Sequence, residues 1–229
     1  MIGTLGAVTR NPVRAVTFDF NGTLSHDEPI LCEIFCELFA EEGRPLSAQE
    51  YFDELAGLSD PEIVWTWLGR DHPRADEVIA ERVARYRAAV SDGSTVPASL
   101  REAVRYAASA VPVAVVTGAA RSEVEPVLAA AGLAGSITAI VSSDDVLEGK
   151  PHPESYLRAL ELLDVGLRPG EAVAFEDTEA GVASAKAAGL RCLAVLGTLA
   201  PERLAAADEI VPAIDVGLMR RLLTGAGPA

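Results

Sequence analysis

The stretch AVTFDFNGTLSHD, residues 15–27, is the part of the sequence from which the fold can be worked out. It begins with apolar and β-branched residues that predict a short buried strand of a parallel sheet, and this strand stops at Asp19. The turn that follows contains Gly22, which adopts backbone angles that other residues resist. In an open α/β sheet, ligands bind at the carboxyl ends of the strands. We therefore expect Asp19 to lie in a functional site, with simple helix capping by this residue as the alternative.

Length and composition set the broad class of the protein. The 229 residues, 49% of them hydrophobic, can bury a full core and are long for one compact domain but short for two large ones. One domain with an insertion fits this length. No run of about 18 apolar residues predicts a membrane span, and residues 1–14 lack the charged start and apolar segment of a secretory signal. These features predict a soluble, cytoplasmic protein that does not act on a membrane.

The charge balance narrows the range of partners. A formal net charge of −15 disfavours nucleic acid and anionic membranes, because their phosphates would be repelled. An anionic substrate must therefore meet local positive charge. The chain has only two lysines, Lys150 and Lys186, so a lysine is an unusual choice here. Three cysteines, an odd number without an export signal, argue against a disulfide framework.

The secondary-structure pattern changes along the chain. Up to about residue 92 the apolar spacing after the first strand is helical throughout, and it predicts helices over residues 28–42, 47–56, 60–68 and 74–90. From residue 97, helices and strands alternate. The expected helices cover residues 98–110, 121–131, 153–163 and 178–188. The expected strands cover residues 111–117, 137–141, 172–176 and 192–196, with a short edge strand at 209–211 and a loose tail at 225–229.

This alternation predicts an α/β protein with a Rossmann-like, doubly wound parallel sheet and helices on both of its faces. A helical block inserted directly after the first strand is expected to cover the carboxyl ends of the strands as a cap. We therefore predict an α/β core domain of residues 1–27 and 93–229 and a small, all-helical cap domain of residues 28–92.

Two later segments carry groups that suit a phosphate. Thr117 ends a predicted strand and Gly118 follows it, where a hydroxyl and backbone amides can bind phosphate oxygens. A strand-to-helix turn capped by Thr117 is the alternative. Lys150 follows a glycine and precedes two nearby prolines, and this rigid turn favours an oriented cation over a solvated surface charge.

A pair of acids, Glu176 and Asp177, ends a further predicted strand. Paired acids near Asp19 suit a hard divalent cation such as Mg²⁺, which prefers oxygen ligands, while helix capping by Asp177 is the alternative. The strand ends thus carry, in chain order, a nucleophile, a hydroxyl, a cation and an acidic pair.

This ordered set resembles the four motifs of the haloacid dehalogenase-like (HAD) hydrolase superfamily, whose first motif reads Asp-x-Asp-Gly-Thr. The resemblance runs from about residue 13 to residue 211. The phrases GKPHPESY (149–156) and EDTEAGVASAKAAG (176–189) are especially similar to the phosphoglycolate phosphatase and β-phosphoglucomutase-like branch, which has a helical cap. Four segments in the family's order make the match specific.

The resemblance implies roles for individual residues. Asp19 would attack phosphorus and form an aspartyl-phosphate, and Glu176 would be a supporting acid. The implied ligands of Mg²⁺ are the carboxylate of Asp19, the backbone carbonyl of Asn21 and the carboxylate of Asp177. The implied phosphate-binding groups are the hydroxyl of Thr117, the amide of Gly118 and the ammonium of Lys150.

Position 21 departs from the family, which has an Asp there that protonates the leaving oxygen and then activates water. Asn21 has no ionisable proton, and general acid–base help is worth about 10²- to 10⁴-fold, so Asn21→Asp is expected to speed the hydrolysis of alkyl phosphates. Three explanations stay open: a slow or specialised phosphohydrolase, an engineered Asp-to-Asn exchange, or a phosphate-binding protein that has lost turnover. Downstream, Asp27 or His26 could supply the acid, although His26 is more typical of a surface residue.

We predict a Mg²⁺-dependent phosphatase that hydrolyses a small phosphorylated metabolite as a monomer or homodimer. A sugar-phosphate mutase of the β-phosphoglucomutase type is the alternative among enzymes, and a non-catalytic phosphate-binding or regulatory protein is the alternative outside them. The loop 55–61 resembles the specificity loop of helical caps. Where hexose-phosphate mutases place a basic residue in it, this chain has Ser59 and Asp60, which weakens the mutase alternative.

Overall fold

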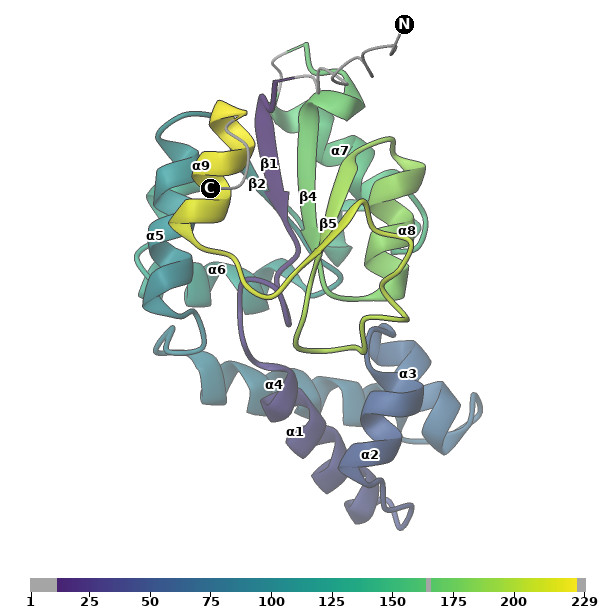
Figure 1. Ribbon diagram of the computed structural model, residues 1–229. Helices are drawn as coiled ribbons and strands as arrows, with labels where there is room; N and C mark the ends of the chain where they lie inside the picture. The colour runs from purple at the N-terminus through teal and green to yellow at the C-terminus, as the bar shows by residue number, and fades with distance from the viewer. Residues whose placement is uncertain (1–11, 164–165, 226–229) are drawn as a thin grey trace, which may run out of the picture.

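The computed structural model describes residues 12–163 and 166–225, and these contain a six-stranded parallel sheet (Figure 1). The strands are β1 (Ala15–Phe18), β2 (Val113–Val116), β3 (Ala139–Val141), β4 (Ala172–Glu176), β5 (Arg191–Val195) and β6 (Glu209–Val211). Their order is β3-β2-β1-β4-β5-β6, and the register pairs Phe18 with Val115 on one side and with Phe175 on the other. Asp19, directly after β1, therefore lies at the switch point where doubly wound sheets bind ligands.

Helices cover both faces of this sheet. Those of the α/β region are α5 (Ala98–Ala108), α6 (Arg121–Ala130), α7 (Glu154–Leu163), α8 (Glu179–Ala187) and α9 (Val216–Thr224), with short 3₁₀ turns η2 (Ala134–Ser136), η3 (Ser143–Asp145) and η4 (Pro169–Glu171). α5 packs with α9 on one face, and α7 packs with α8 on the other (Figure 1). The predicted doubly wound α/β fold is confirmed. No helix in the described residues has both the length and the hydrophobicity that a membrane crossing needs.

One predicted helix, at residues 47–56, is wrong in its form. The segment contains a single α-helical turn, α2 (Ala48–Glu50), followed by a π-helix, η1 (Tyr51–Leu55). The wide turn closes with a hydrogen bond of 2.8 Å from the Ala56 amide to the Tyr51 carbonyl. Tyr51 and Leu55 are both buried, and because they are four positions apart they lie on the same, inner face of the segment.

The other predicted elements lie within two residues of their expected bounds, and the edge strand is confirmed as β6. The helix α9 was not predicted. It begins at Asp215, whose carboxylate accepts a hydrogen bond of 2.7 Å from the Leu218 amide and so caps the helix. Of the expected tail at 225–229, residues 226–229 lie outside the described residues.

The segment between β1 and α5 forms a layer of helices beyond the carboxyl ends of the strands, which we call the helical insertion (Figure 1). It contains α1 (Glu28–Glu41), α2, η1, α3 (Asp60–Leu68) and α4 (Ala75–Val90). Aromatic rings hold its interior together: Phe35 lies 5.5 Å from Phe39 and 6.1 Å from Tyr51, and Phe39 lies 6.4 Å from Trp67, measured between ring centroids. The division into a cap domain of residues 28–92 and a core domain stays a prediction.

A buried ion pair joins the helical insertion to the α/β region. Arg82 on α4 donates to the carboxylate of Glu123 on α6 and lies 3.2 Å from the carboxylate of Asp60 on α3. The side chains of Arg82 and Glu123 are only 5% and 2% exposed. Glu123 also accepts a hydrogen bond of 3.2 Å from the Ala120 amide, so the same carboxylate caps the start of α6. Arg82 therefore links α4 to both α3 and α6.

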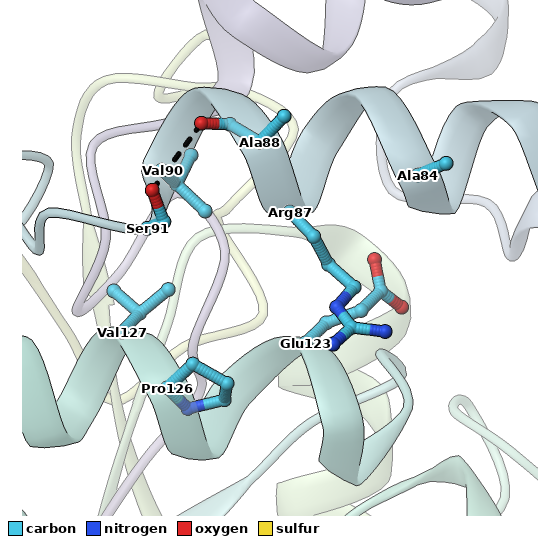
Figure 2. Close-up of a pocket in the computed structure, with 8 residues that line it drawn as sticks. All are labelled: Ala84, Arg87, Ala88, Val90, Ser91, Glu123, Pro126 and Val127. Atoms are coloured by element: carbon cyan, nitrogen blue, oxygen red, sulfur yellow. Dashed lines mark hydrogen bonds between the residues drawn. The ribbon is translucent and has the colours of Figure 1, made fainter.

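The apolar contact between α4 and α6 is partial. A cavity of about 420 Å³ remains between the two helices. Figure 2 shows Val90 on α4 and Val127 on α6 facing each other at one end of it, with Arg87 and Glu123 at the other end. The pair of Arg82 and Glu123 is therefore an important polar link between these helices.

We expect Arg82→Ala to lower the free energy of unfolding by about 3–5 kcal/mol, because it leaves the buried carboxylate of Glu123 without its cation. The matched control is Arg85→Ala in the same helix. Arg85 pairs only with exposed glutamates, so its loss should cost about 0–1 kcal/mol. Urea unfolding of the parent and both variants measures the difference. Similar small losses in both variants would show that the Arg82 pair does not stabilise the fold.

Candidate active site

The turn after β1 packs directly against the end of β4. The amide of Asp19 donates a hydrogen bond of 2.9 Å to the carbonyl of Phe175, and the Asp19 side chain is largely buried. Gly22 has a φ of +72°, and a side-chain carbon built there would lie 1.9 Å from Oδ2 of Asp177. Only glycine fits this position, because both the backbone angle and the space exclude a side chain.

Lys150 lies between two of the predicted acids. Its Nζ donates a hydrogen bond of 2.5 Å to Oδ1 of Asp19 and one of 3.0 Å to the carbonyl of Val116, and it lies 2.6 Å from Oε1 of Glu176. The Tyr156 hydroxyl donates to the same Glu176 oxygen. Burial alone would lower the pKa of Lys150, but the attraction of Asp19 and Glu176 raises it above its ordinary value. Lys150 therefore remains a cation.

Thr117 and Gly118 lie at the end of β2, the strand next to β1. The Thr117 side chain is buried, and its hydroxyl oxygen accepts a hydrogen bond of 3.0 Å from the Ala119 amide. Gly118 is exposed, and a side-chain carbon there would have no atom within 4 Å. The open space beside Gly118 leaves room for an anion at the strand end, next to the groups around Asp19.

Three carboxylates gather where β1 and β4 end. Asp19, Glu176 and Asp177 each place an oxygen within 4.8 Å of the others, and all three residues are buried. Asp177 accepts hydrogen bonds from the hydroxyls of Thr23, at 3.1 Å, and Thr198, at 2.5 Å. Burial raises the pKa of Asp177 well above its ordinary range, and the nearby charges of Asp19 and Glu176 raise it further. The three carboxylates repel one another unless a cation or protons neutralise their charge.

The chemistry of these side chains fits Mg²⁺. All the donors are oxygens, which hard divalent cations prefer, and a cation would relieve the repulsion between the acids. Glu176 is already bound by Lys150 and Tyr156, whereas Asp177 is bound only by hydroxyl groups. Asp19 and Asp177 are therefore the carboxylates best placed to hold a metal, with Glu176 in a supporting position.

Asn21 is joined to Asp27, which the sequence offered as a possible acid, and to Tyr86, which was not expected beside it. Its Nδ2 donates hydrogen bonds of 3.0 Å to Oδ2 of Asp27 and 3.0 Å to the hydroxyl oxygen of Tyr86 on α4. Asp27 is fully buried, and this burial raises the pKa of its carboxyl group. Hydrogen bonds from Ser25, Tyr86 and the Gly22 amide oppose the rise but do not cancel it. His26 is exposed, as its sequence position suggested. The side chain at position 21 is thus held by both the turn and the helical insertion.

The loop 55–61 of the helical insertion lies against the acidic strand end. A side-chain carbon built at Gly57 would be 3.0 Å from the Cγ2 methyl of Thr178, the residue after Asp177. Gly57 has a φ of +91°, which also favours glycine. The loop that resembles the specificity loop of helical caps therefore lies beside the strand end that carries Asp177.

Sequence reasoning missed four residues of the site: Thr23, Tyr86, Tyr156 and Thr198. Thr23 and Tyr156 lie inside the phrases GTL and GKPHPESY, where their contacts with acids give no signal of their own. Tyr86 and Thr198 come from segments 65 and 177 positions after Asn21, and no local pattern marks them. Only the packing of the helical insertion and of the loop after β5 brings these hydroxyls to the carboxylates.

Comparison with known proteins agrees with this geometry. Residues 13–189 match the model of the haloacid dehalogenase-like hydrolase family. Validoxylamine A 7'-phosphate phosphatase from Streptomyces hygroscopicus subsp. limoneus is 32% identical over 204 residues, which cover 86% of this chain and 92% of the relative. Protein CbbY from Rhodobacter capsulatus is also 32% identical, over 78% of this chain and 83% of its own length.

Solved structures show the same fold. The crystal structure of CbbY from Rhodobacter sphaeroides in complex with phosphate superposes with a TM-score of 0.77 at 28% identity, covering 88% of this chain and 95% of that one. β-Phosphoglucomutase from Clostridium difficile has a TM-score of 0.78 over 93% of this chain and 98% of its own, at 16% identity. The chain belongs to the haloacid dehalogenase-like hydrolases, in the branch that contains phosphoglycolate phosphatases, CbbY and β-phosphoglucomutases.

Proposed function

We propose that this enzyme hydrolyses the phosphate monoester of a small organic molecule, with Asp19 as the nucleophile. The observation that carries the proposal is the position of Lys150, which bridges Asp19 and Glu176 at the switch point of the sheet. A buried carboxylate held beside a permanent cation is oriented and lies close to the positive charge that a phosphate needs. The named phosphatases among the relatives support the same reaction class.

The reaction has two displacements at phosphorus. In the first, an Asp19 oxygen forms a bond to phosphorus while the bond to the ester oxygen breaks, and the alcohol leaves with a proton from its surroundings. In the second, water forms a bond to phosphorus and gives up a proton to its surroundings, the bond to Asp19 breaks, and inorganic phosphate is released. Lys150, the Thr117 hydroxyl and the Gly118 amide would bind the phosphoryl oxygens through both displacements.

The residues suited to a metal in this reaction are Asp19, Asp177 and the backbone carbonyl of Asn21. Bound there, Mg²⁺ would neutralise charge between the nucleophile and the incoming phosphate, two anions that otherwise repel. Thr23 and Thr198 would hold the Asp177 carboxylate in place for this ligation. Glu176 and Tyr156 would in turn orient Lys150.

The substrate is proposed to be a small phosphorylated metabolite of sugar-like character. The relatives include a validoxylamine A 7'-phosphate phosphatase and a hexitol phosphatase, and a structure of a CbbY mutant holds xylulose-(1,5)bisphosphate. A sugar-phosphate mutase is the alternative within the family, and Asn21 favours a third candidate, a non-catalytic phosphate-binding or regulatory protein, because it cannot donate a proton to the leaving group.

A screen of small phosphate esters, with phosphate release as the readout, tests the proposed reaction. The parent should release phosphate from at least one ester in the presence of Mg²⁺, and Asp19→Asn should lower that rate by about 10³-fold or more because the nucleophile is lost. Asp71→Asn, an exposed residue with the same change of side chain, is the control and should keep the parent rate. No release from any ester, or equal rates in Asp19→Asn and the parent, would refute the proposal.

We expect Mg²⁺ to bind the parent and to raise its melting temperature, and Asp177→Asn to abolish that rise. Affinity should fall as the pH is lowered, because burial and the neighbouring acids raise the pKa of Asp177 and protons then compete with the metal. Calorimetric titration at pH 6 and pH 8 and thermal scans with and without Mg²⁺ give both readouts. Asp144→Asn, an exposed acid, serves as the control. Unchanged affinity in Asp177→Asn would refute the metal assignment.

The two lysines of the chain allow a matched test of phosphate binding. Lys150→Ala should weaken competitive inhibition by phosphate and vanadate by about tenfold or more, because a buried charged partner is removed. Lys186→Ala should leave inhibition unchanged, since Lys186 is partly exposed and pairs with Asp208. Circular dichroism checks that both variants are folded. Equal inhibition constants in Lys150→Ala and the parent would contradict the assigned role.

A further inference from the structure

The Asn21 side chain takes part in a triangle of three hydrogen-bonded polar atoms, one each from Asn21, Asp27 and Tyr86. Nδ2 of Asn21 lies 3.0 Å from Oδ2 of Asp27 and 3.0 Å from the hydroxyl oxygen of Tyr86, and that hydroxyl donates a hydrogen bond of 2.5 Å to the same Asp27 oxygen. Asp27 and Tyr86 are both fully buried. The triangle joins the turn after β1, the residue before α1, and α4 of the helical insertion.

The partners of Asp27 determine which way the Asn21 amide faces. Donors converge on both carboxylate oxygens: Oδ2 accepts from Asn21 and Tyr86, and Oδ1 accepts a hydrogen bond of 3.2 Å from the Gly22 amide. An Asp oxygen in this arrangement requires an N–H from Asn21, so Nδ2 and not Oδ1 must face it. Oδ2 of Asp27 and the Tyr86 hydroxyl oxygen lie only 2.5 Å apart, so both face the same side of Nδ2 and share one N–H. Oδ1 of the amide is turned away from Asp27 and can accept a hydrogen bond.

We propose that Asp27 is a positioning residue for the reaction at Asp19: with Tyr86 it holds the Asn21 amide in one orientation, and it makes an Asp at position 21 incompatible with the Asp at position 27. This inference rests on the proposed hydrolysis and deepens it. It also revises the expectation that Asn21→Asp alone restores an acid, because that change would set two carboxyl groups 3.0 Å apart, and a proton shared between them is not free for the leaving group.

The residues at positions 21 and 27 can be exchanged with each other in one double variant. Asn21→Asp combined with Asp27→Asn keeps one carboxyl and one amide in the triangle and restores an N–H donor between them, now from position 27. The carboxyl then lies where the family has its general acid. The test compares the parent, each single variant and the double variant, with Asp71→Asn in place of Asp27→Asn as a matched control, because residue 71 is exposed.

Steady-state phosphate release is measured with one alkyl and one aryl phosphate. Asn21→Asp alone should gain less than about threefold on the alkyl ester, whereas the double variant should exceed it by about tenfold or more, within the range of acid–base catalysis. The aryl ester, whose leaving group needs little protonation, should respond less. Asp27→Asn alone should lower kcat with KM changed by less than about twofold, because the amide loses its fixed orientation while substrate binding remains.

Thermal unfolding gives a readout that does not depend on turnover. Asn21→Asp should lower the melting temperature by about 4 °C or more, and adding Asp27→Asn should recover most of that loss. The control, Asn21→Asp with Asp71→Asn, should recover none. Tyr86→Phe, which keeps the ring, should reduce the coupling between positions 21 and 27 in the same scans, because it removes one side of the triangle.

Two results would overturn the inference. One is that Asn21→Asp alone raises the rate of alkyl-ester hydrolysis as much as the double variant does, which would show that positions 21 and 27 act independently. The other is recovery of the melting temperature by the Asp71→Asn control. If no variant releases phosphate from any ester, the proposed hydrolysis has failed, and the melting temperatures alone decide: recovery specific to Asp27→Asn supports the pairing, and its absence refutes it.

Discussion

The repulsion between buried carboxylates is the constraint on which this site depends. Asp19, Glu176 and Asp177 approach within 4.8 Å of one another in a buried region, where like charges interact strongly. One ammonium, that of Lys150, holds two of the three, and threonine hydroxyls hold the third. Together, the acids and the residues that hold them come from segments at the ends of four different strands, β1, β3, β4 and β5. The charge arrangement therefore requires the parallel sheet, because only its common carboxyl edge brings those segments together.

The same charges explain why a second cation is expected. Lys150 is already engaged by Asp19 and Glu176 before any substrate binds. A phosphate monoester adds up to two negative charges beside Asp19, so the site would carry a large excess of negative charge with Lys150 alone. A divalent cation held by oxygen donors offsets this excess where it arises, between the nucleophile and the phosphate. Mg²⁺ is thus proposed from the charge of the residues as well as from the family.

The sequence predicted the sheet and the strand-end acids because both leave local signals. Apolar runs that stop at Asp19 and at Glu176 define strands and place carboxylates at their ends without knowledge of distant contacts. Tyr86 and Thr198 leave no such signal, since each is an ordinary residue until tertiary packing turns its hydroxyl toward an acid. The π-helix at residues 51–55 was missed for a related reason: a buried pair four positions apart, such as Tyr51 and Leu55, fits an α-helix equally well, so the pattern carries no signal for the wider turn.

The orientation of the Asn21 amide has a consequence for the substrate. Under the proposed mechanism the first displacement needs a proton at the leaving oxygen, and the second needs water aligned with phosphorus. Because an amide has no ionisable proton, Asn21 can help only the second, by accepting a hydrogen bond from water at Oδ1. The missing proton is worth about 3–5 kcal/mol, which corresponds to a rate factor of 10²- to 10⁴-fold. A leaving group that departs readily as an anion escapes this cost. Under the proposed mechanism, the sugar-like substrates that are favoured are therefore those whose ester oxygen leaves readily as an anion.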